Sequence, residues 1–300
     1  MVIWRITDGK AGHDSQSLGL VSALASLLDI EAFTIPAPSL LASCAQLITT
    51  YPPGEPTFPK PEMVVGAGRA THLPLVTTRR ATEARSIVLM KPSLPLAWFD
   101  LCLIPRHDRV SPKVNIIATD GALNTIRAGR EQRDNRGLIM IGGPSVHFDW
   151  DPATLLAQLE TVLARSSNVA WQITDSRRTP ETTRHNLRSL AGPKTKYIPH
   201  EQTNDAWISQ HLDEAATIWV TGDSVSMIYE ALSAGGAVGL LEIPPRRDGR
   251  LQRGLRELRR RQRLTAFAEW REGALLAAAE IPLSEATRCA ALIVHRWFND

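Results

Sequence analysis

Short apolar stretches alternate with helical patterns along the 300-residue chain, and this alternation predicts an α/β protein with parallel sheets. In the first half we expect strands at 2–7, 32–35, 63–65, 87–90, 101–104 and 114–118, and helices at 15–28 and 40–48. In the second half we expect strands at 137–141, 170–174, 197–199, 217–221 and 237–241, and helices that begin at 152, 180, 204 and 224. These strands are almost wholly apolar, which suits a sheet that is covered on both faces.

The alternation forms two separate runs. Residues 119–136 contain four arginines, two glycines and little apolar periodicity, so we place a linker there. We therefore expect two Rossmann-like domains that face one another across a cleft, at 1–135 and 136–282. Residues 283–300 should form a C-terminal helix, for which a crossing back to the N-terminal domain is one option.

The first predicted strand leads directly into a glycine-containing loop at 8–13. Gly9 and Gly12 would let the backbone approach a ligand, Lys10 would neutralise an anion, and His13 would act as a base near neutral pH. The spacing fits neither a P-loop nor the three-glycine dinucleotide fingerprint. A histidine in a loop is more often structural or simply exposed, so the pattern alone leaves both interpretations open.

Small residues and cations follow other predicted strands as well. Gly68 and Arg69 come after the third strand, and Arg106, with Asp108 and Arg109, comes after the fifth. In a parallel sheet these positions lie at the carboxyl edge, where functional loops gather. The arginines either contact a ligand or form local ion pairs that fix a loop.

Residues 217–242 read as a complete strand, helix and strand unit. Gly222 and Asp223 form its first turn, Ser224 opens the helix, and Gly235-Gly236 ends it. The N-terminus of such a helix favours anions, and Ser224 and Ser226 would add two hydroxyl donors. Glu230 lies two turns further on. The alternative is that Ser224 is only an N-cap and Glu230 only a solvated residue.

The second half opens with a comparable loop. Gly142 and Gly143 follow its first strand and would let a phosphate or ribose approach the backbone, to which Ser145 can donate. A simple turn is the alternative. Arg177 and Arg178 follow the strand at 170–174.

The composition is that of an ordinary globular chain, with 43% apolar and 22% charged residues and a formal charge of +3. Cys44, Cys102 and Cys289 are too far apart in the sequence to suggest a metal or redox pair, so we expect a reducing compartment. No stretch resembles a signal peptide or reaches the length of about 18 apolar residues needed to cross a membrane. We therefore expect a cytoplasmic protein.

An arginine-rich segment at 246–263 carries nine arginines. Leu251, Leu255 and Leu258 fall at helical spacing, which predicts an amphipathic helix with a narrow apolar stripe. Such a helix lies on an anionic membrane surface, holds a diphosphate, contacts nucleic acid, or only packs on the core with a solvated basic face. Nucleic acid ranks last, because base-stacking aromatic residues are absent around it.

Several motifs, taken in order, resemble the mitochondrial-fission ELM-type family, which has many bacterial members. They are TDGKAGHDSQSLGL, VVGAGRATHLP, IPRHD, LIMIGGPSVHFDWD, ITDSRRTP, IWVTGDSVSMIYEALSAGGAV and PLSEAT. They span nearly the whole chain. The family looks like the GT-B glycosyltransferases, in particular the MurG type, which transfers a sugar from a UDP-sugar to a lipid-linked acceptor.

This resemblance implies a role for each loop. Gly9, Gly12 and His13 match the acceptor side, with Lys10, Gly68, Arg69 and Arg106 near it. The nucleotide-sugar side matches Gly142, Gly143, Ser145, Gly222, Ser224, Ser226 and Glu230, with Glu230 on the ribose, and we expect Arg177 to bind on the same side. The implied activity is an inverting sugar transfer from a nucleotide-diphosphate sugar to a cell-envelope acceptor, with no cofactor and no metal, in which His13 or Asp8 deprotonates the acceptor hydroxyl.

Asp223 departs from this pattern, because it brings a negative charge to the place where the diphosphate is expected. It would cost affinity unless it points away, meets Arg177 or Arg178, or shares a cation with the ligand. A second hypothesis is accordingly a non-catalytic adaptor with a GT-B-like scaffold, whose arginine-rich helix contacts a partner or an anionic membrane.

Overall fold

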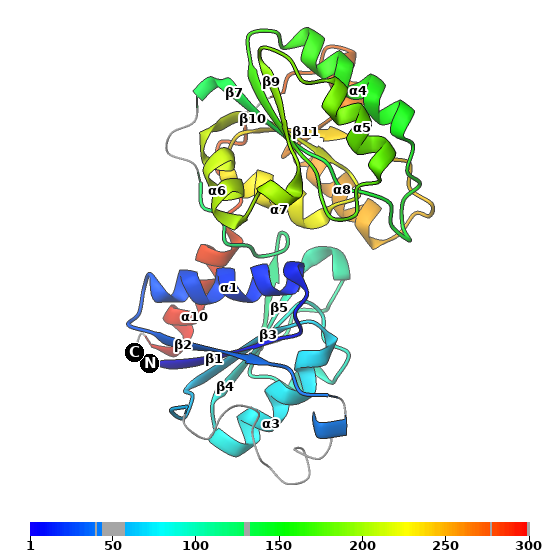
Figure 1. Ribbon diagram of the computed structural model, residues 1–300. Helices are drawn as coiled ribbons and strands as arrows, with labels where there is room; N and C mark the ends of the chain where they lie inside the picture. Colours follow the sequence, from blue (N-terminus) through cyan, green and yellow to red (C-terminus); the bar gives the residue numbers. More distant parts are fainter. Residues whose placement is uncertain (40, 44–57, 129–132, 277, 299–300) are drawn as a thin grey trace. The chain divides into compact units, whose positions relative to one another are not determined.

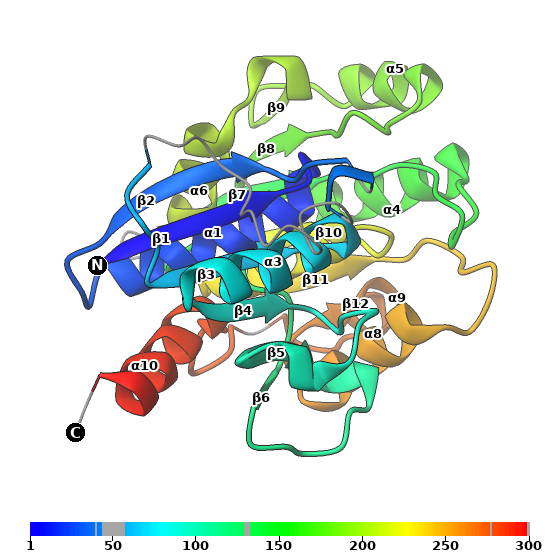
Figure 2. The same ribbon diagram turned by 90° about the horizontal axis from the view of Figure 1, so that it is seen from below.

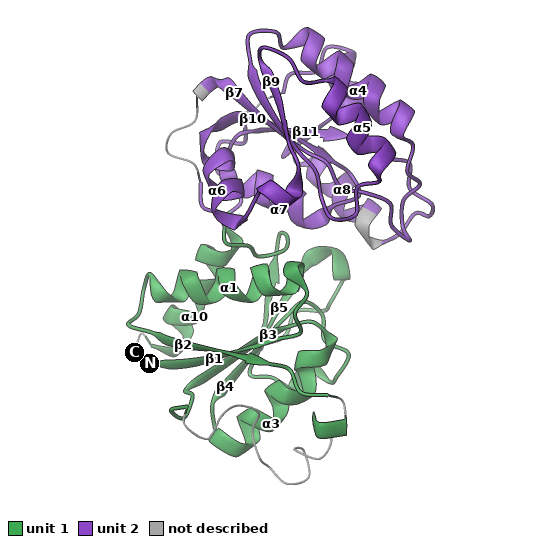
Figure 3. Ribbon diagram, in the orientation of Figure 1, with its two compact units in different colours: residues 1–125, 284–300 green, residues 126–283 purple. Residues whose placement is uncertain are grey.

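The chain forms two compact units, shown in different colours in Figure 3. The computed structural model describes residues 1–39, 41–43, 58–128, 133–276 and 278–298. Unit 1 comprises residues 1–125 and 284–300, and unit 2 comprises residues 126–283. The division predicted at 135/136 falls inside strand β7 (Arg133–Met140). In the structure, unit 2 begins at Ile126, before that strand.

Unit 1 is built on a parallel sheet with the strand order β2-β1-β3-β4-β5-β6. The strands are β1 (Val2–Thr7), β2 (Glu31–Pro36), β3 (Met63–Ala67), β4 (Arg85–Leu89), β5 (Leu101–Pro105) and β6 (Ile116–Thr119). Every residue of β3 and β5 is buried, as expected for strands with helices on both faces.

Helices cover both faces of this sheet (Figure 1). Helix α1 (Ala11–Ala25) and helix α10 (Glu285–Trp297) share one core cluster, in which Leu20 and Leu24 meet Cys289 and Ile293. Helix α3 (His72–Thr82) covers the opposite face. The C-terminal helix is therefore part of unit 1. Its buried Glu285 accepts from the backbone N–H of Asp120 at 2.9 Å, just past the end of β6.

Unit 2 repeats the plan with the strand order β12-β11-β10-β7-β8-β9, again all parallel. Its further strands are β8 (Ala170–Thr174), β9 (Thr195–Ile198), β10 (Ala215–Thr221), β11 (Ala237–Leu241) and the short β12 (Thr265–Ala266). Helices α4 (Pro152–Arg165), α5 (Glu181–Ser189) and α9 (Phe267–Arg271) pack on one face. Helices α6 (Asp205–Glu214) and α7 (Val225–Ala234) lie on the other. Helix α8 (Arg250–Arg260) lies with α9 and β12 at one end of the sheet (Figure 2).

Two helix ends carry recognisable caps, and the glycine at 235 was predicted as one of them. The Asp151 side chain accepts from the backbone N–H of Ala153, with Pro152 in the first turn of α4. Gly235 ends α7 in the left-handed conformation at φ 89°, which glycine adopts without strain. No helix in the described part of the chain is both long and apolar enough to span a lipid bilayer.

The start of the first helix was predicted wrongly. It begins at Ala11, not at 15, because the Asp8 carboxylate accepts from the Lys10 N–H and supports the turn that leads into it. Gly12 and His13 consequently stand in the first helical turn. Of the predicted helix 40–48, residues 41–43 are described and are helical, while the other residues, including Cys44, lie outside the described part of the chain.

Candidate functional site

Asp8 and His13 form a hydrogen-bonded pair at the carboxyl end of β1. His13 Nδ1 lies 2.9 Å from Asp8 Oδ2 and 3.0 Å from Oδ1. The Asp8 side chain is only 5% exposed, while that of His13 is 24% exposed. A buried carboxylate at Nδ1 holds the Nδ1–H tautomer and leaves the Nε2 lone pair available, so the pair is suited to general-base chemistry.

Gly68 supplies the wall behind this pair, at the end of β3. A Cβ atom at Gly68 would lie 2.3 Å from His13 Nδ1 and 2.7 Å from Asp8 Oδ2. Its φ of 92° is also one that side chains rarely adopt. Glycine is therefore required here because it leaves room for the Asp8–His13 pair.

A second histidine, His72, lies near the pair and was not singled out from the sequence. Burial, with the nearby charges of Arg69 and His13, lowers the pKa of His72 to about 4. Its Nδ1 lies 3.1 Å from the Ser93 hydroxyl oxygen and 3.4 Å from the Ser93 amide nitrogen, and with its pKa this low the ring is neutral near pH 7. Only the burial of His72 in the folded chain sets it apart from the other histidines, and no local sequence pattern reveals that burial.

The other predicted acceptor-side residues differ in their surroundings. Lys10 is exposed, with Nζ 3.9 Å from Asp8. Gly9 adopts φ 73° in the loop, and the Gly12 carbonyl accepts from the Gln16 side chain. Arg106 donates from Nε to Asp120 at 2.7 Å, so it fixes the loop after β5, as the ion-pair interpretation expected.

In unit 2, the amides of Gly142 and Gly143 are already bonded within the protein. The Gly142 N–H donates to Thr221 Oγ1 at 2.8 Å, and the Gly143 N–H donates to Asp223 Oδ2 at 3.0 Å. A Cβ at Gly142 would lie 2.3 Å from Asp223 Oδ2, and one at Gly143 would lie 2.3 Å from the Arg178 carbonyl oxygen. These glycines thus allow the ends of β7, β8 and β10 to pack closely.

Asp223 meets Arg178, one of the options that the sequence left open. Its carboxylate is fully buried and accepts from Arg178 Nη2 at 2.7 Å. Arg178 also donates from Nη1 to the Gly143 carbonyl at 2.6 Å. Arg177, the predicted ligand, is exposed and makes no hydrogen bond or ion pair to any described residue. Consecutive arginines point in different directions, and the sequence does not show which of them turns inward.

The N-terminus of α7 carries the predicted serines. Ser224 is the N-cap residue, yet its side chain makes no capping hydrogen bond, and Ser226 is exposed in the first turn. Both hydroxyls are thus available to a ligand. Gly222 donates its N–H to the Leu241 carbonyl at 3.0 Å and belongs to the strand edge. Burial and the charge of Asp205 raise the pKa of Glu230 to about 7.

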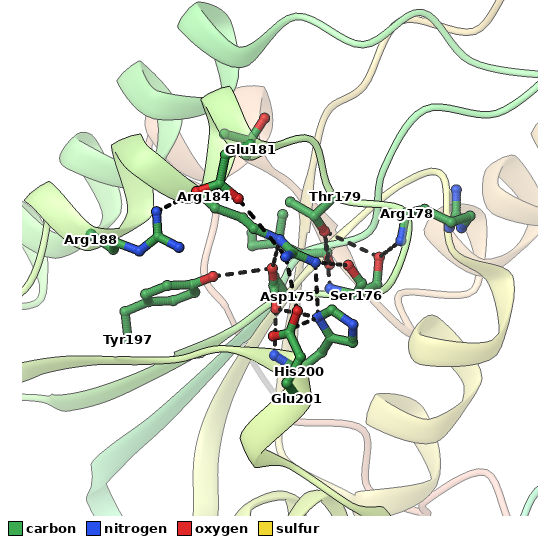
Figure 4. Close-up of polar contacts among 12 residues, drawn as sticks. Asp175, Ser176, Arg178, Thr179, Glu181, Arg184, Arg188, Tyr197, His200 and Glu201 are labelled. Atoms are coloured by element: carbon green, nitrogen blue, oxygen red, sulfur yellow. Dashed lines mark hydrogen bonds and ion pairs between the residues drawn. The ribbon is translucent and has the colours of Figure 1, made fainter.

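A cluster around Asp175, at the end of β8, was also missed (Figure 4). Asp175, His200 and Glu201 lie close enough to offer three metal-ligand atoms. Arg184 contacts all three, with Nε 2.7 Å from Asp175, Nη1 3.0 Å from Glu201 and Nη2 3.0 Å from His200 Nδ1. The guanidinium therefore occupies the place of a cation and ties the 200–202 turn to β8.

The arginine-rich helix α8 is less cationic than its composition suggests. Among the described side chains, Glu257 pairs with Arg260 and Arg261, and Glu269 pairs with Arg259. Leu255 and Leu258 are buried, as the predicted apolar stripe requires, while the Leu251 side chain lies outside the described part. The helix packs on the core by its leucines and neutralises part of its charge locally.

Solved structures with the same fold cover the whole chain. A putative UDP-N-acetylglucosamine 2-epimerase of Listeria monocytogenes is 11% identical, with 99% of this chain and 97% of that chain covered and a TM-score of 0.58. The Neisseria meningitidis UDP-GlcNAc 2-epimerase bound to UDP-GlcNAc is 10% identical, covers 100% of both chains and has a TM-score of 0.52. Acinetobacter baumannii MurG is 11% identical, with 99% and 91% covered and a TM-score of 0.50. The predicted GT-B fold is confirmed.

Two comparisons of the sequence give matches over most of the chain. The uncharacterized protein RP120 of Rickettsia prowazekii is 25% identical over 292 residues, covering 78% of this chain and 81% of its own length. The family model described as mitochondrial fission ELM1 matches residues 11–297. This match includes almost every loop described above, so the chain belongs to the mitochondrial fission ELM1 family.

Proposed function

We propose that the protein is a GT-B glycosyltransferase that transfers a sugar from a nucleotide-diphosphate sugar to a hydroxyl group of a cell-envelope acceptor. The observation that carries this proposal is the Asp8–His13 pair, a buried carboxylate that orients a partly exposed imidazole at the edge of a parallel sheet. The MurG and UDP-GlcNAc 2-epimerase structures, with which it shares its fold, make a sugar nucleotide the expected substrate.

His13 acts as the general base. Its Nε2 accepts the proton of the acceptor hydroxyl while that oxygen forms the new bond to the anomeric carbon. The bond from this carbon to the diphosphate breaks in the same step, and its electron pair leaves with the diphosphate, so the configuration inverts. Asp8 orients the ring and stabilises the imidazolium that forms.

Unit 2 binds the nucleotide diphosphate at the N-terminus of α7. The unbonded first-turn amides and the hydroxyls of Ser224 and Ser226 donate to the phosphate oxygens, and the helix dipole favours their charge. Gly142 and Gly143 shape this edge by close packing, since their amides are already bonded. Ser145 and the exposed Arg177 are the further donors on this side.

Glu230 suits a ribose diol. A carboxyl whose pKa is raised to about 7 is largely protonated in slightly acidic solution, where it both donates and accepts a hydrogen bond. It also adds little negative charge near the diphosphate. We therefore expect nucleotide affinity to weaken as the pH rises above 7.

The test is calorimetric titration with UDP, GDP, CMP and ADP sugars. One nucleotide should bind, and Ser224→Ala and Glu230→Ala should each weaken it, whereas Ser209→Ala on the exposed side of α6 should not. His13→Gln should leave the affinity unchanged but abolish turnover in a donor-hydrolysis screen. If no nucleotide binding depends on Ser224 or Glu230, the proposal is wrong.

If no nucleotide binds in this way, the adaptor hypothesis is the remaining alternative. It predicts binding to anionic liposomes that weakens with salt and on changing Arg259, Arg260 and Arg261 to Glu. Because all three arginines already pair with Glu257 or Glu269, the structure does not favour it. Binding that is absent or insensitive to salt would exclude it.

A further inference from the structure

We infer that unit 2 holds a second binding site, a pocket for a single amphiphilic molecule with an anionic head group. The pocket has a volume of about 520 Å³, within the size range of small-molecule sites. It lies at the carboxyl end of β11, between α4, α8 and α9. Except for Gly222, none of the residues assigned above to the nucleotide lines it, so this inference goes beyond the proposed function.

The inner lining is apolar. Aromatic, aliphatic and proline side chains come from the loop before α4, the end of β11 with the segment after it, α8 and α9: Phe148, Leu240, Ile243, Pro244, Pro245, Leu255 and Phe267. Phe148, Ile243, Leu255 and Phe267 are buried in the folded chain. A surface of this kind binds a hydrocarbon chain by removing apolar area from water.

Hydrogen bonds within the protein already occupy several polar groups of the pocket wall. The Gln158 amide donates to the Glu242 carbonyl at 2.9 Å and accepts from the Glu242 N–H at 2.8 Å. The Glu242 carboxylate accepts from the Ala268 N–H at 3.0 Å. The hydroxyls of Thr154 and Thr161 donate to Asp151 and to the Ala157 carbonyl. The polar groups left for a ligand are therefore mainly the Gln252 amide and the guanidinium groups of the lining arginines.

Positive charge is concentrated in the arginines of the lining, Arg256, Arg259 and Arg271. Arg256 pairs with Asp248 and Arg259 with Glu269. Arg271 has no carboxylate partner among the described residues, and its guanidinium lies 5.9 Å from the ring of Phe267. An anionic head placed beside Arg271 gains a charge-assisted hydrogen bond while its tail covers the phenyl ring.

The experiment is calorimetry of the full-length protein with dodecyl phosphate below its critical micelle concentration. We expect one molecule to bind per chain, and dodecyltrimethylammonium to bind at least tenfold more weakly, because Arg271 lacks a carboxylate partner among the described residues, whereas the Glu242 carboxylate of the lining already accepts a hydrogen bond from the Ala268 N–H. Equal affinity for the cationic and anionic amphiphiles would overturn the proposal.

Two pairs of variants locate the site. Arg271→Gln should weaken dodecyl phosphate by about tenfold or more, whereas Arg296→Gln, an exposed arginine on α10, should have no effect. Ala157→Phe should fill the pocket and abolish binding, whereas Ala153→Phe, one turn earlier on α4 and outside the lining, should not. Unchanged binding by Ala157→Phe would refute the site.

A competition experiment separates this site from the nucleotide site. UDP should not displace dodecyl phosphate, and Ala157→Phe should leave nucleotide binding intact. Displacement by UDP together with loss of nucleotide binding in Ala157→Phe would show that the pocket belongs to the nucleotide. That result would overturn this inference and leave the proposed glycosyltransferase activity standing.

Discussion

Glu230 should make the stability of the protein depend on pH, and Glu230→Gln isolates this effect. In the folded chain, burial and Asp205 raise the pKa of the carboxyl from 4.5 to about 7, whereas in the unfolded chain it returns to its ordinary value. The difference of about 2.5 pH units corresponds to about 3 kcal/mol, at 1.36 kcal/mol per unit.

The sign follows from proton binding. Between pH 4.5 and 7 the folded state keeps a proton that the unfolded state has lost, so the free energy of unfolding falls as the pH rises through this window. Glutamine has no proton to lose. The stability of Glu230→Gln relative to the wild type should therefore increase by about 2–3 kcal/mol between pH 5 and pH 8.

Urea denaturation followed by circular dichroism at pH 5, 6, 7 and 8 measures this difference. Glu160→Gln, on the exposed side of α4, is the matched control and should show a constant difference. Asp205→Asn should lower the pKa of Glu230 and reduce the pH dependence, since it removes the nearby charge. A difference between Glu230→Gln and wild type that does not change with pH would refute the reasoning.

Three further predictions test how the sites are held. Gly68→Ala should displace His13 and abolish donor hydrolysis, because the added Cβ would lie too close to the imidazole. Gly192→Ala is the control and should have no effect, since a Cβ there meets no other atom within 4 Å. A crystal structure of Gly68→Ala with His13 in its original position would contradict this. Arg178→Met should lower the free energy of unfolding, measured by urea denaturation, by about 2 kcal/mol or more, because the variant leaves the buried Asp223 carboxylate unpaired. Asp223→Asn should cost less, since it removes that charge. Arg184→Ala should bind Zn²⁺ in calorimetry, because Asp175, His200 and Glu201 would lose the guanidinium that lies between them. The wild type should not bind it, and equal Zn²⁺ binding by both proteins would contradict the prediction.

The strands were predictable because a parallel sheet covered on both faces needs continuous apolar runs. For β11 the predicted and observed bounds agree, and every residue is buried. The start of α1 was not predictable in the same way. Gly12 costs a helix only about 1 kcal/mol, which the turn at Asp8 and the packing of the rest of the helix outweigh.

Residues that lie together in the candidate site could be recognised from the sequence where one local segment supplies them, and not where several segments meet. Asp8 and His13 are five residues apart, and the loop between them signals the pair. The Asp175 cluster joins β8, α5 and the turn after β9, so it exists only once β8 and β9 pair. Arg178, and not Arg177, reaches Asp223 because of the direction of the backbone at each position in the turn. Two identical side chains in a row do not show that direction in the sequence.

The anion site proposed in unit 2 has to accommodate acidic residues at its own edge, and the structure neutralises them by two different means. Asp223 is paired with Arg178, Asp175 is paired with Arg184, and Glu230 is neutralised by retaining its proton. In both ion pairs a guanidinium lies against the carboxylate and supplies the opposite charge. The proton on Glu230 is lost as the pH passes 7. Glu230 should therefore control how the affinity for a diphosphate changes with pH, while Asp223 and Asp175 hold the edge in place.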